Sequence, residues 1–216
     1  MDIDVVGFDW SGTCSDDMRP VYEADMRILD LYGKKRMPLG EWRQNTTASA
    51  VEFFNNRGIH GDPEMLHALY KEKYDEVVRG GIKPVPFEDT GIAMKYIQMD
   101  EKKIFVLSTH PEENLKNEAQ DYGFSEYIDL IVGDSKDKTK DLQRICSGLQ
   151  IEPGRVLYVG DTDHDIKSGR EAGVITVGIC GPPWKQRGYH DRVRLELEDP
   201  DYMIECPEEI WDIYEE

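Results

Sequence analysis

Groups able to take part in catalysis occur at four widely spaced points of this sequence. They are Asp9 in FDWSGT, Ser108 in FVLST, Lys138 in GDSKDKTK, and the pair Asp161 and Asp165 in GDTDHD. Carboxylate oxygens are ligands that Mg²⁺ prefers, and a carboxylate can also act as a nucleophile. Together these groups suit phosphoryl transfer, in which Asp9 attacks in line to form an aspartyl-phosphate while Lys138 and the metal neutralise charge on the phosphorus.

The pattern of apolar and polar residues predicts the elements that position these groups. A strand is expected at 3–8, followed by three helices at 20–32, 41–56 and 62–79. After the proline-containing segment 83–86, strands alternate with helices, which is typical of a parallel sheet built from βαβ units. The expected strands are 103–107, 130–132, 156–159, 174–179 and 202–205, and the expected helices are 88–98, 112–121, 138–148, 163–171 and 207–214.

This order predicts an α/β fold with a Rossmann-like parallel sheet core flanked by helices and an inserted all-α domain. The core is expected at 1–17 and 84–216, and the insertion at 18–83. In an open parallel sheet the carboxyl ends of the strands meet at one edge. The residues that follow the strands should therefore come together there.

Charge and composition exclude several classes of partner. The chain has 26 Lys and Arg and 44 Asp and Glu, so its net charge is −18. This charge argues against nucleic acid and against an anionic membrane surface as binding partners. No apolar run approaches the roughly 18 residues of a membrane span. The N-terminus shows no secretion signal, and the four cysteines form no C-x-x-C pair, so a cytoplasmic location is expected. The acidic stretch 191–216 is interpreted as a solvated face.

The four motifs, in this order, resemble those of the haloacid dehalogenase superfamily, and DYMIECPEEI near the end is similar to phosphoglycolate-phosphatase-like members. The resemblance implies that the helical insertion is a mobile cap and that the cofactor is Mg²⁺. It implies metal binding by Asp9, the carbonyl of Ser11, Asp161 and Asp165. It assigns the hydroxyl to Ser108 rather than Thr109 as the first residue after the strand, and the catalytic amine to Lys138 rather than Lys136 or Lys140. Substrate contacts are expected from Gly12, Thr109 and the cap residue Arg43.

The sequence departs from the family pattern at Ser11. Phosphatases of this family have an Asp there, which protonates the leaving alcohol and later activates water. A serine hydroxyl stays protonated near neutral pH and cannot do this well. Related families have Ala at this position in phosphonoacetaldehyde hydrolases, Thr in P-type ATPases and Tyr in the dehalogenases proper. Substrates with good leaving groups are therefore expected to be favoured.

Two alternatives to a phosphatase follow from the same residues. The run DWSGT resembles the DWAGT of phosphonoacetaldehyde hydrolases, which cleave a C–P bond, but Arg43 aligns where their cap provides a Schiff-base lysine, and Lys34 and Lys35 lie upstream. A protein that binds phosphorylated ligands without turnover is the second alternative. The expected ligand is in each case a small phosphorylated or phosphonate metabolite. The sequence specifies neither the physiological substrate nor the oligomeric state.

Overall fold

The computed structural model describes residues 2–47, 49–182 and 187–215, and the chain divides into two compact units. The first unit comprises Met1–Asp16 and Pro86–Glu216, and the second comprises Asp17–Val85. The short strands β2 (Ser15–Asp16) and β3 (Val85–Pro86) form a two-stranded sheet where the chain leaves and re-enters the first unit.

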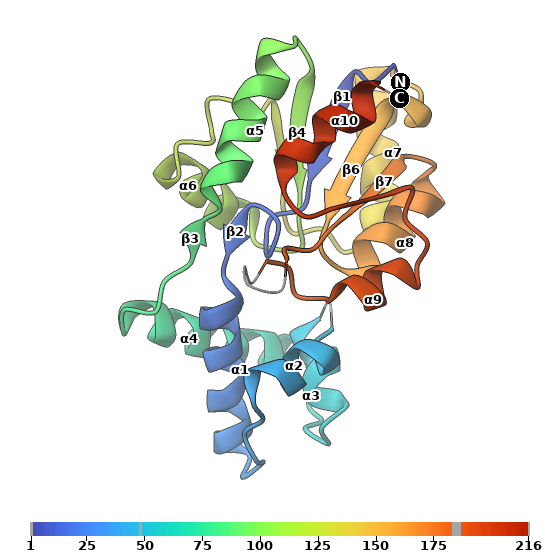
Figure 1. Cartoon of the computed structure of the whole chain (residues 1–216). Coiled ribbons are helices and arrows are strands. Elements are labelled where there is room, and N and C mark those ends of the chain that lie inside the picture. The colour runs from blue at the N-terminus through green and yellow to red at the C-terminus, as the bar shows by residue number, and fades with distance from the viewer. Residues whose placement is uncertain (1, 48, 183–186, 216) are drawn as a thin grey trace. The chain divides into compact units, whose positions relative to one another are not determined.

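A six-stranded sheet forms the centre of the first unit (Figure 1). Its order is β5-β4-β1-β6-β7-β8, and every neighbouring pair is parallel. The strands are β1 (Val5–Phe8), β4 (Lys103–Leu107), β5 (Leu130–Val132), β6 (Val156–Gly160), β7 (Ile175–Ile179) and β8 (Tyr202–Ile204). Phe8 of β1 is in register with Val106 of β4 and Val159 of β6, so these three strands end within one residue of one another. The predicted α/β fold with a parallel sheet is confirmed.

Alternating side chains of the strands enter two hydrophobic cores, one on each face of the sheet. Val6 and Phe8 of β1 pack with α5 (Glu88–Met99), α6 (Glu112–Asp121) and α10 (Ile210–Glu215), whereas Val5 packs with α7 (Lys138–Leu149) and α8 (Asp163–Ala172). The two-residue period of a strand produces this division. The remaining short helices are the 3₁₀ turns Pro153–Arg155 and Pro207–Glu209 and the helix α9 (Arg192–Glu196). Among the residues that the structure describes, no helix is long and apolar enough to cross a membrane.

The described residues of the second unit form four helices. They are α1 (Met18–Leu31), α2 (Leu39–Asn45), α3 (Ala50–Asn55) and α4 (Pro63–Arg79). The side chain of Asp62 accepts hydrogen bonds of 3.0 Å from the N–H groups of Glu64 and Met65, and Pro63 occupies the first turn, as expected for the start of α4. Helix α1 packs along α4, and both bury apolar side chains in the interior of this unit.

The single helix predicted at 41–56 is wrong, because the chain is divided there between α2 and α3. Thr46, which follows α2, has an extended backbone with φ −67° and ψ 151°. The side chains around it bind the local backbone, since Asn45 donates to the carbonyl of Glu41 at 2.8 Å and Thr47 donates to the carbonyl of Ser49 at 2.8 Å. Such bonds compete with continuation of the helix.

A buried carboxylate lies in the interior of the second unit. Asp25 of α1 is buried and accepts a hydrogen bond of 2.8 Å from the indole N–H of Trp42. Within the described part of the chain, its Oδ1 atom is buried and has no hydrogen-bond partner. Burial raises the pKa of Asp25 to about 7, although the bond from Trp42 and the nearby Arg57 act in the opposite direction. The protonated form is therefore the one that fits this interior.

We expect Asp25→Asn to weaken the pH dependence of stability. The pKa of Asp25 is higher in the folded chain than in the unfolded chain, so its contribution is present at low pH and is lost as the pH rises from about 4 through about 7. The substitution should reduce the fall in melting temperature between pH 5 and pH 8 by on the order of 5 °C. Asp75→Asn, at an exposed position of α4, is the control. Equal pH profiles for the wild type and Asp25→Asn would contradict this account.

Candidate functional site

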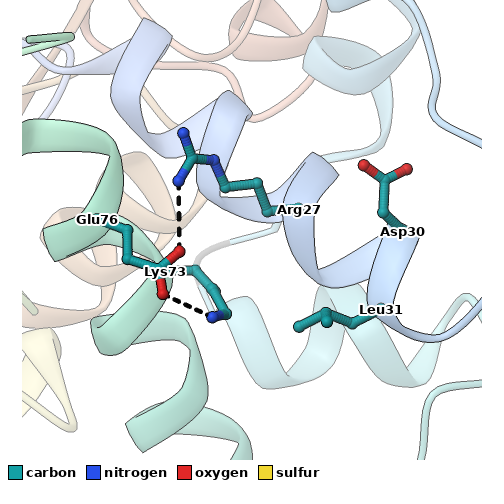
Figure 2. A pocket seen from close by; sticks show the side chains of 5 residues that line it. All are labelled: Arg27, Asp30, Leu31, Lys73 and Glu76. Atoms are coloured by element: carbon teal, nitrogen blue, oxygen red, sulfur yellow. Dashed lines mark hydrogen bonds and ion pairs between the residues drawn. The ribbon is translucent and has the colours of Figure 1, made fainter. Parts of the chain in front are cut away.

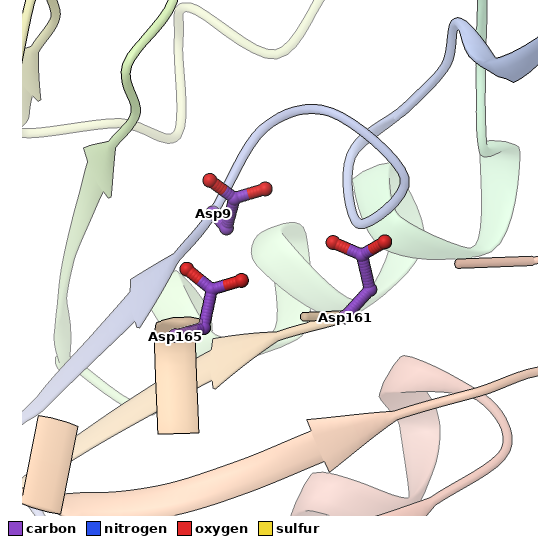
Figure 3. A group of neighbouring side chains, drawn as sticks. All are labelled: Asp9, Asp161 and Asp165. Atoms are coloured by element: carbon purple, nitrogen blue, oxygen red, sulfur yellow. The ribbon is translucent and has the colours of Figure 1, made fainter. Parts of the chain in front are cut away.

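Three buried aspartates meet at the carboxyl edge of the sheet. Asp9 follows β1, Asp161 follows β6, and Asp165 lies in the first turn of α8. One carboxylate oxygen of each lies within 4.8 Å of the others (Figure 3). The N–H of Asp9 donates to the carbonyl of Val159 at 2.8 Å, which fixes the end of β1 against β6. The parallel pairing of β1 and β6 thus brings together residues that are distant in the sequence.

Lys138 is the lysine that the structure places against these aspartates. It is the first residue of α7, and its Nζ lies 2.5 Å from Oδ1 of Asp9 and 2.6 Å from Oδ1 of Asp165. Lys136 and Lys140 are exposed, and Lys140 pairs with Asp137 at 2.8 Å. Helix α7 begins where Asp137 accepts a hydrogen bond from the N–H of Lys140. That cap sets the first turn so that Lys138 points into the protein.

The charges of this cluster do not balance. Asp9, Asp161 and Asp165 are 5%, 0% and 1% exposed, and Lys138, at 4%, is the ammonium that contacts Asp9 and Asp165. Burial raises the pKa of Asp9 to about 7, and Asp165 adds to this effect while Lys138 opposes it. Burial would also raise the pKa of Asp165, but Lys138 and the hydroxyl of Thr162 outweigh it and hold that pKa below its usual range.

When all three buried carboxylates are ionised, the single ammonium leaves two negative charges uncompensated. A divalent cation would balance them, and carboxylate oxygens at this spacing are suitable ligands for a hard cation. The cluster can therefore hold a metal ion. Asp9 and Asp165 share Lys138, so two of the three carboxylates that would hold a cation are already fixed by ion pairs.

Side chains that the motifs do not indicate hold Asp165 in place. Its Oδ2 accepts hydrogen bonds from the N–H of Thr162 at 3.1 Å and from the hydroxyl of Thr162 at 2.5 Å, and its Oδ1 accepts one from the hydroxyl of Tyr158 at 3.2 Å. Thr162 and Asp165 also form the capping box of α8. The threonine before this helix is a signal that could have been found from sequence. Tyr158 gives none, because it lies within an apolar strand.

The loop after β1 packs directly on Asp161. Gly12 has φ +78°, and a Cβ atom at this position would lie 2.2 Å from Oδ2 of Asp161, so only glycine fits. The hydroxyl of Thr13 donates to Oδ1 of Asp161 at 3.3 Å. Ser11 is half-buried, and the N–H of Gly12 donates to the carbonyl of Ser15 at 2.8 Å. This hydrogen bond joins the two ends of the loop. The substrate contact expected of Gly12 stays a prediction.

Ser108 lies at the same edge of the sheet as Asp9. It directly follows β4 and is buried, whereas Thr109 is exposed. The N–H of Ser108 donates to the carbonyl of Val132 at 3.0 Å, and its hydroxyl oxygen accepts a hydrogen bond of 3.3 Å from the N–H of His110. Strand β4 is parallel to β1 and ends within one residue of it, so Asp9 and Ser108 lie at the same edge of the sheet.

Arg43 belongs to the second unit, in the last turn of α2, where it is half-buried. Its expected contact with substrate stays a prediction. A pocket of about 330 Å³ also belongs to this unit and shares no residue with the aspartate cluster (Figure 2). Its lining includes Arg27 and Lys73, which both pair with Glu76, at 3.3 and 2.7 Å. With Asp30 also present, the charges of this pocket cancel, so it offers no excess positive charge to a phosphate.

Comparisons with known proteins extend over most of the chain. A family model for haloacid dehalogenase-like hydrolases matches residues 6–179. A phosphoglycolate phosphatase of Aquifex aeolicus is 27% identical over 218 residues, which cover 95% of this chain and 94% of that protein. A pyrophosphatase of Bacillus cereus is 22% identical, with coverage of 95% and 93%. The crystal structure of a predicted phosphatase from Clostridium acetobutylicum has a TM-score of 0.82 at 16% identity and full coverage of both chains, which shows the fold.

The charge of the cluster predicts stabilisation by a divalent cation. Because the metal binds the folded cluster, a concentration of about 100 times its Kd should stabilise the chain by about 2.7 kcal/mol, which is on the order of 5 °C in melting temperature. Asp161→Asn should remove most of this shift. Asp212→Asn, at an exposed site of α10, should retain it. Thermal unfolding with and without Mg²⁺ at constant ionic strength is the measurement, and equal shifts in the two variants would argue against a metal at the cluster.

Proposed function

The chain belongs to the haloacid dehalogenase-like hydrolase family, and we propose that it is a Mg²⁺-dependent phosphatase that forms an aspartyl-phosphate at Asp9. The family and the phosphatase type of enzyme, both expected from the four motifs, are confirmed by the match to residues 6–179 and by the phosphatase relatives. The observation that carries the proposal is the buried contact of 2.5 Å between Asp9 and Lys138 beside two further carboxylates.

In this proposal each residue of the cluster has a defined task. A carboxylate oxygen of Asp9 attacks the phosphorus while the bond from phosphorus to the leaving-group oxygen breaks, and water then hydrolyses the aspartyl-phosphate to release phosphate. Lys138 holds the nucleophile and neutralises charge that gathers on the phosphoryl oxygens. The hydroxyl of Ser108 donates to the phosphoryl group. Asp161, Asp165 and the carbonyl of Ser11 hold Mg²⁺ together with Asp9. When bound, Mg²⁺ supplies the positive charge that brings two anions, nucleophile and substrate, together.

The second unit, Asp17–Val85, is proposed to act as the cap that covers the substrate. Closure of a cap excludes water during transfer, and opening releases the product. Two features support this part of the proposal: the unit is compact, and the chain enters and leaves it next to the short strands β2 and β3. Two crossings of this kind can act as hinges.

A small phosphorylated metabolite is the proposed substrate. Relatives include a phosphoglycolate phosphatase and a pyrophosphatase, which supports a small anionic ligand. Ser11 favours hydrolysis of a pyrophosphate bond over that of an alkyl phosphate. A phosphate leaving group departs as a stable anion and needs no acid. A cytoplasmic location is part of the same proposal and is supported by the free thiols of Cys14, Cys146 and Cys206.

A second candidate function is C–P bond cleavage in a phosphonate. The run DWSGT favours it, because phosphonoacetaldehyde hydrolases also have a residue without a carboxylate at the position of Ser11. Arg43 opposes it, because a guanidinium cannot form the Schiff base that those enzymes use. The two functions differ in the bond that breaks, and an assay with both substrates separates them.

Ser11→Asp is the variant that tests the missing acid. If the chain is a phosphatase, a carboxylate at this position should increase hydrolysis of an alkyl phosphate by roughly 10²–10⁴-fold, the range of general acid–base catalysis. An aryl or acyl phosphate or pyrophosphate should gain less in the attack step, because its leaving group needs no proton. Phosphate release is measured for each substrate and for phosphonoacetaldehyde, before and after the substitution. Asp9→Asn is the control and should abolish turnover.

Three results of this series would count against the proposal. Unchanged turnover in Asp9→Asn would exclude the aspartyl-phosphate. Activity on phosphonoacetaldehyde alone, with no gain on alkyl phosphates in Ser11→Asp, would favour C–P cleavage. Binding of phosphate analogues without any phosphate release, in both the wild type and Ser11→Asp, would indicate a ligand-binding protein.

Arg43→Ala tests the proposed cap. If Arg43 contacts an anionic substrate, its loss should raise the KM severalfold with a smaller change in kcat, because the interaction is lost in ground state and transition state alike. Lys71→Ala removes an exposed cation of α4 in the same unit and should leave the KM unchanged. A KM for Arg43→Ala equal to that of Lys71→Ala would show that Arg43 takes no part in substrate binding.

A further inference from the structure

The segment Arg187–His190, which lies between β7 and α9, packs on Asp161. The N–H of Tyr189 donates to Oδ2 of Asp161 at 2.5 Å, and the N–H of His190 donates to the carbonyl of Asp161 at 3.3 Å. The ring of His190 accepts a hydrogen bond at Nδ1 from the N–H of Asp163 at 3.0 Å. All four residues of the segment are buried. The orientation of the Asp161 carboxylate therefore depends on the backbone of this segment.

Close packing limits how the segment can move relative to Asp161. Gly188 has φ +82°, and a Cβ atom there would lie 3.2 Å from Cβ of Asp161 and 3.3 Å from the carbonyl of Ile179. On the other side of the carboxylate, the ring of Tyr189 would lie 2.8 Å from a Cβ atom at Gly12. Asp161 is thus in close contact with the backbone at Gly12 and at Gly188, which carry no side chain.

A buried ion pair fixes the start of this segment. The side chain of Arg187 is fully buried, and its two terminal nitrogens bind both carboxylate oxygens of Asp89, at 3.1 and 2.5 Å. The guanidinium also donates to the hydroxyl of Thr90 at 3.1 Å and lies 4.1 Å from the centre of the Phe87 ring. A bidentate pair of this kind defines direction as well as distance. Arg187 therefore anchors the segment to the first turn of α5.

The same network reaches Asp161 by a second route. The hydroxyl of Thr90 donates to the carbonyl of Thr13 at 3.1 Å, and the hydroxyl of Thr13 donates to Oδ1 of Asp161 at 3.3 Å. Arg187 is thus connected to one oxygen of Asp161 through Tyr189 and to the other through Thr90 and Thr13. Both oxygens of this carboxylate are oriented by groups that the Arg187–Asp89 pair holds.

We propose that Arg187 is a positioning residue that, through Asp89 and the backbone of Tyr189, sets the orientation in which Asp161 binds the metal ion. This inference rests on the proposed function, in which Asp161 is a metal ligand. Residues that orient a ligand commonly change metal affinity by 10–100-fold when they are replaced. A lysine at 187 keeps the charge but cannot make the two parallel bonds to Asp89.

The test is the affinity of the intact chain for Mn²⁺, measured by calorimetry or by the electron paramagnetic resonance of free Mn²⁺. Arg187→Lys and Asp89→Asn should weaken Mn²⁺ binding by about 10–100-fold. At saturating metal, kcat on an aryl phosphate should largely recover, because neither residue contacts the reacting atoms. Asp89→Asn keeps an acceptor oxygen for Arg187 and provides a second variant if Arg187→Lys does not fold.

Arg155→Gln is the matched control. Arg155 binds Asp4 at 2.8 Å beside the start of β1, at the opposite end of that strand from Asp9. Its loss should lower the melting temperature without changing Mn²⁺ affinity. If folded Arg187→Lys and Asp89→Asn bind Mn²⁺ as tightly as the wild type, Arg187 has a structural role only and the inference fails. If the wild type and Asp161→Asn bind Mn²⁺ equally, the metal site itself fails, and the inference fails with it.

Discussion

The buried contact between Lys138 and two aspartates is the interaction on which the rest of the site depends. Like charges about 4 Å apart repel by about 4 kcal/mol at an effective dielectric constant near 20. Three buried carboxylates are tolerable only because Lys138 lies between Asp9 and Asp165 and hydrogen bonds from Thr13 and Tyr189 hold Asp161. The remaining negative charge makes the cluster a receptor for cations. The same excess of negative charge that destabilises the cluster gives it affinity for a cation.

The fold meets this constraint by joining segments that are distant in sequence. Strands β1, β4 and β6 are neighbours and end within one residue of one another, so the polar residue that follows each strand lies at the same edge. Helix α7 begins there with its lysine, and α8 begins there with Asp165. Helix starts also carry partial positive charge, which favours carboxylates placed in the first turn. The position of each catalytic group is thus set by where an element begins or ends.

The parts of the site that could be predicted from sequence are those with a local signature. Asp9, Ser108 and Asp161 each follow an apolar run, and Lys138 begins a stretch with helical spacing. No such local signature exists for Tyr158, Arg187 and Tyr189, because their hydrogen-bond partners come from other parts of the chain. An arginine in a sequence is also expected to lie at the surface, although Arg187 is buried. The break at Thr46 was likewise hidden, since a few side-chain hydrogen bonds decide it against good helical periodicity.

The pairing of β1 has a consequence for how the chain is made. Val5 pairs with Lys103 on one side and Val156 on the other, whereas the helical unit Asp17–Val85 is continuous in sequence. During synthesis the helical unit is complete long before β1 has either neighbour. An apolar strand with two open edges must wait while most of the chain leaves the ribosome, and such strands aggregate readily. We therefore expect the yield of this protein in a cell to depend on that waiting time as well as on the stability of the finished sheet.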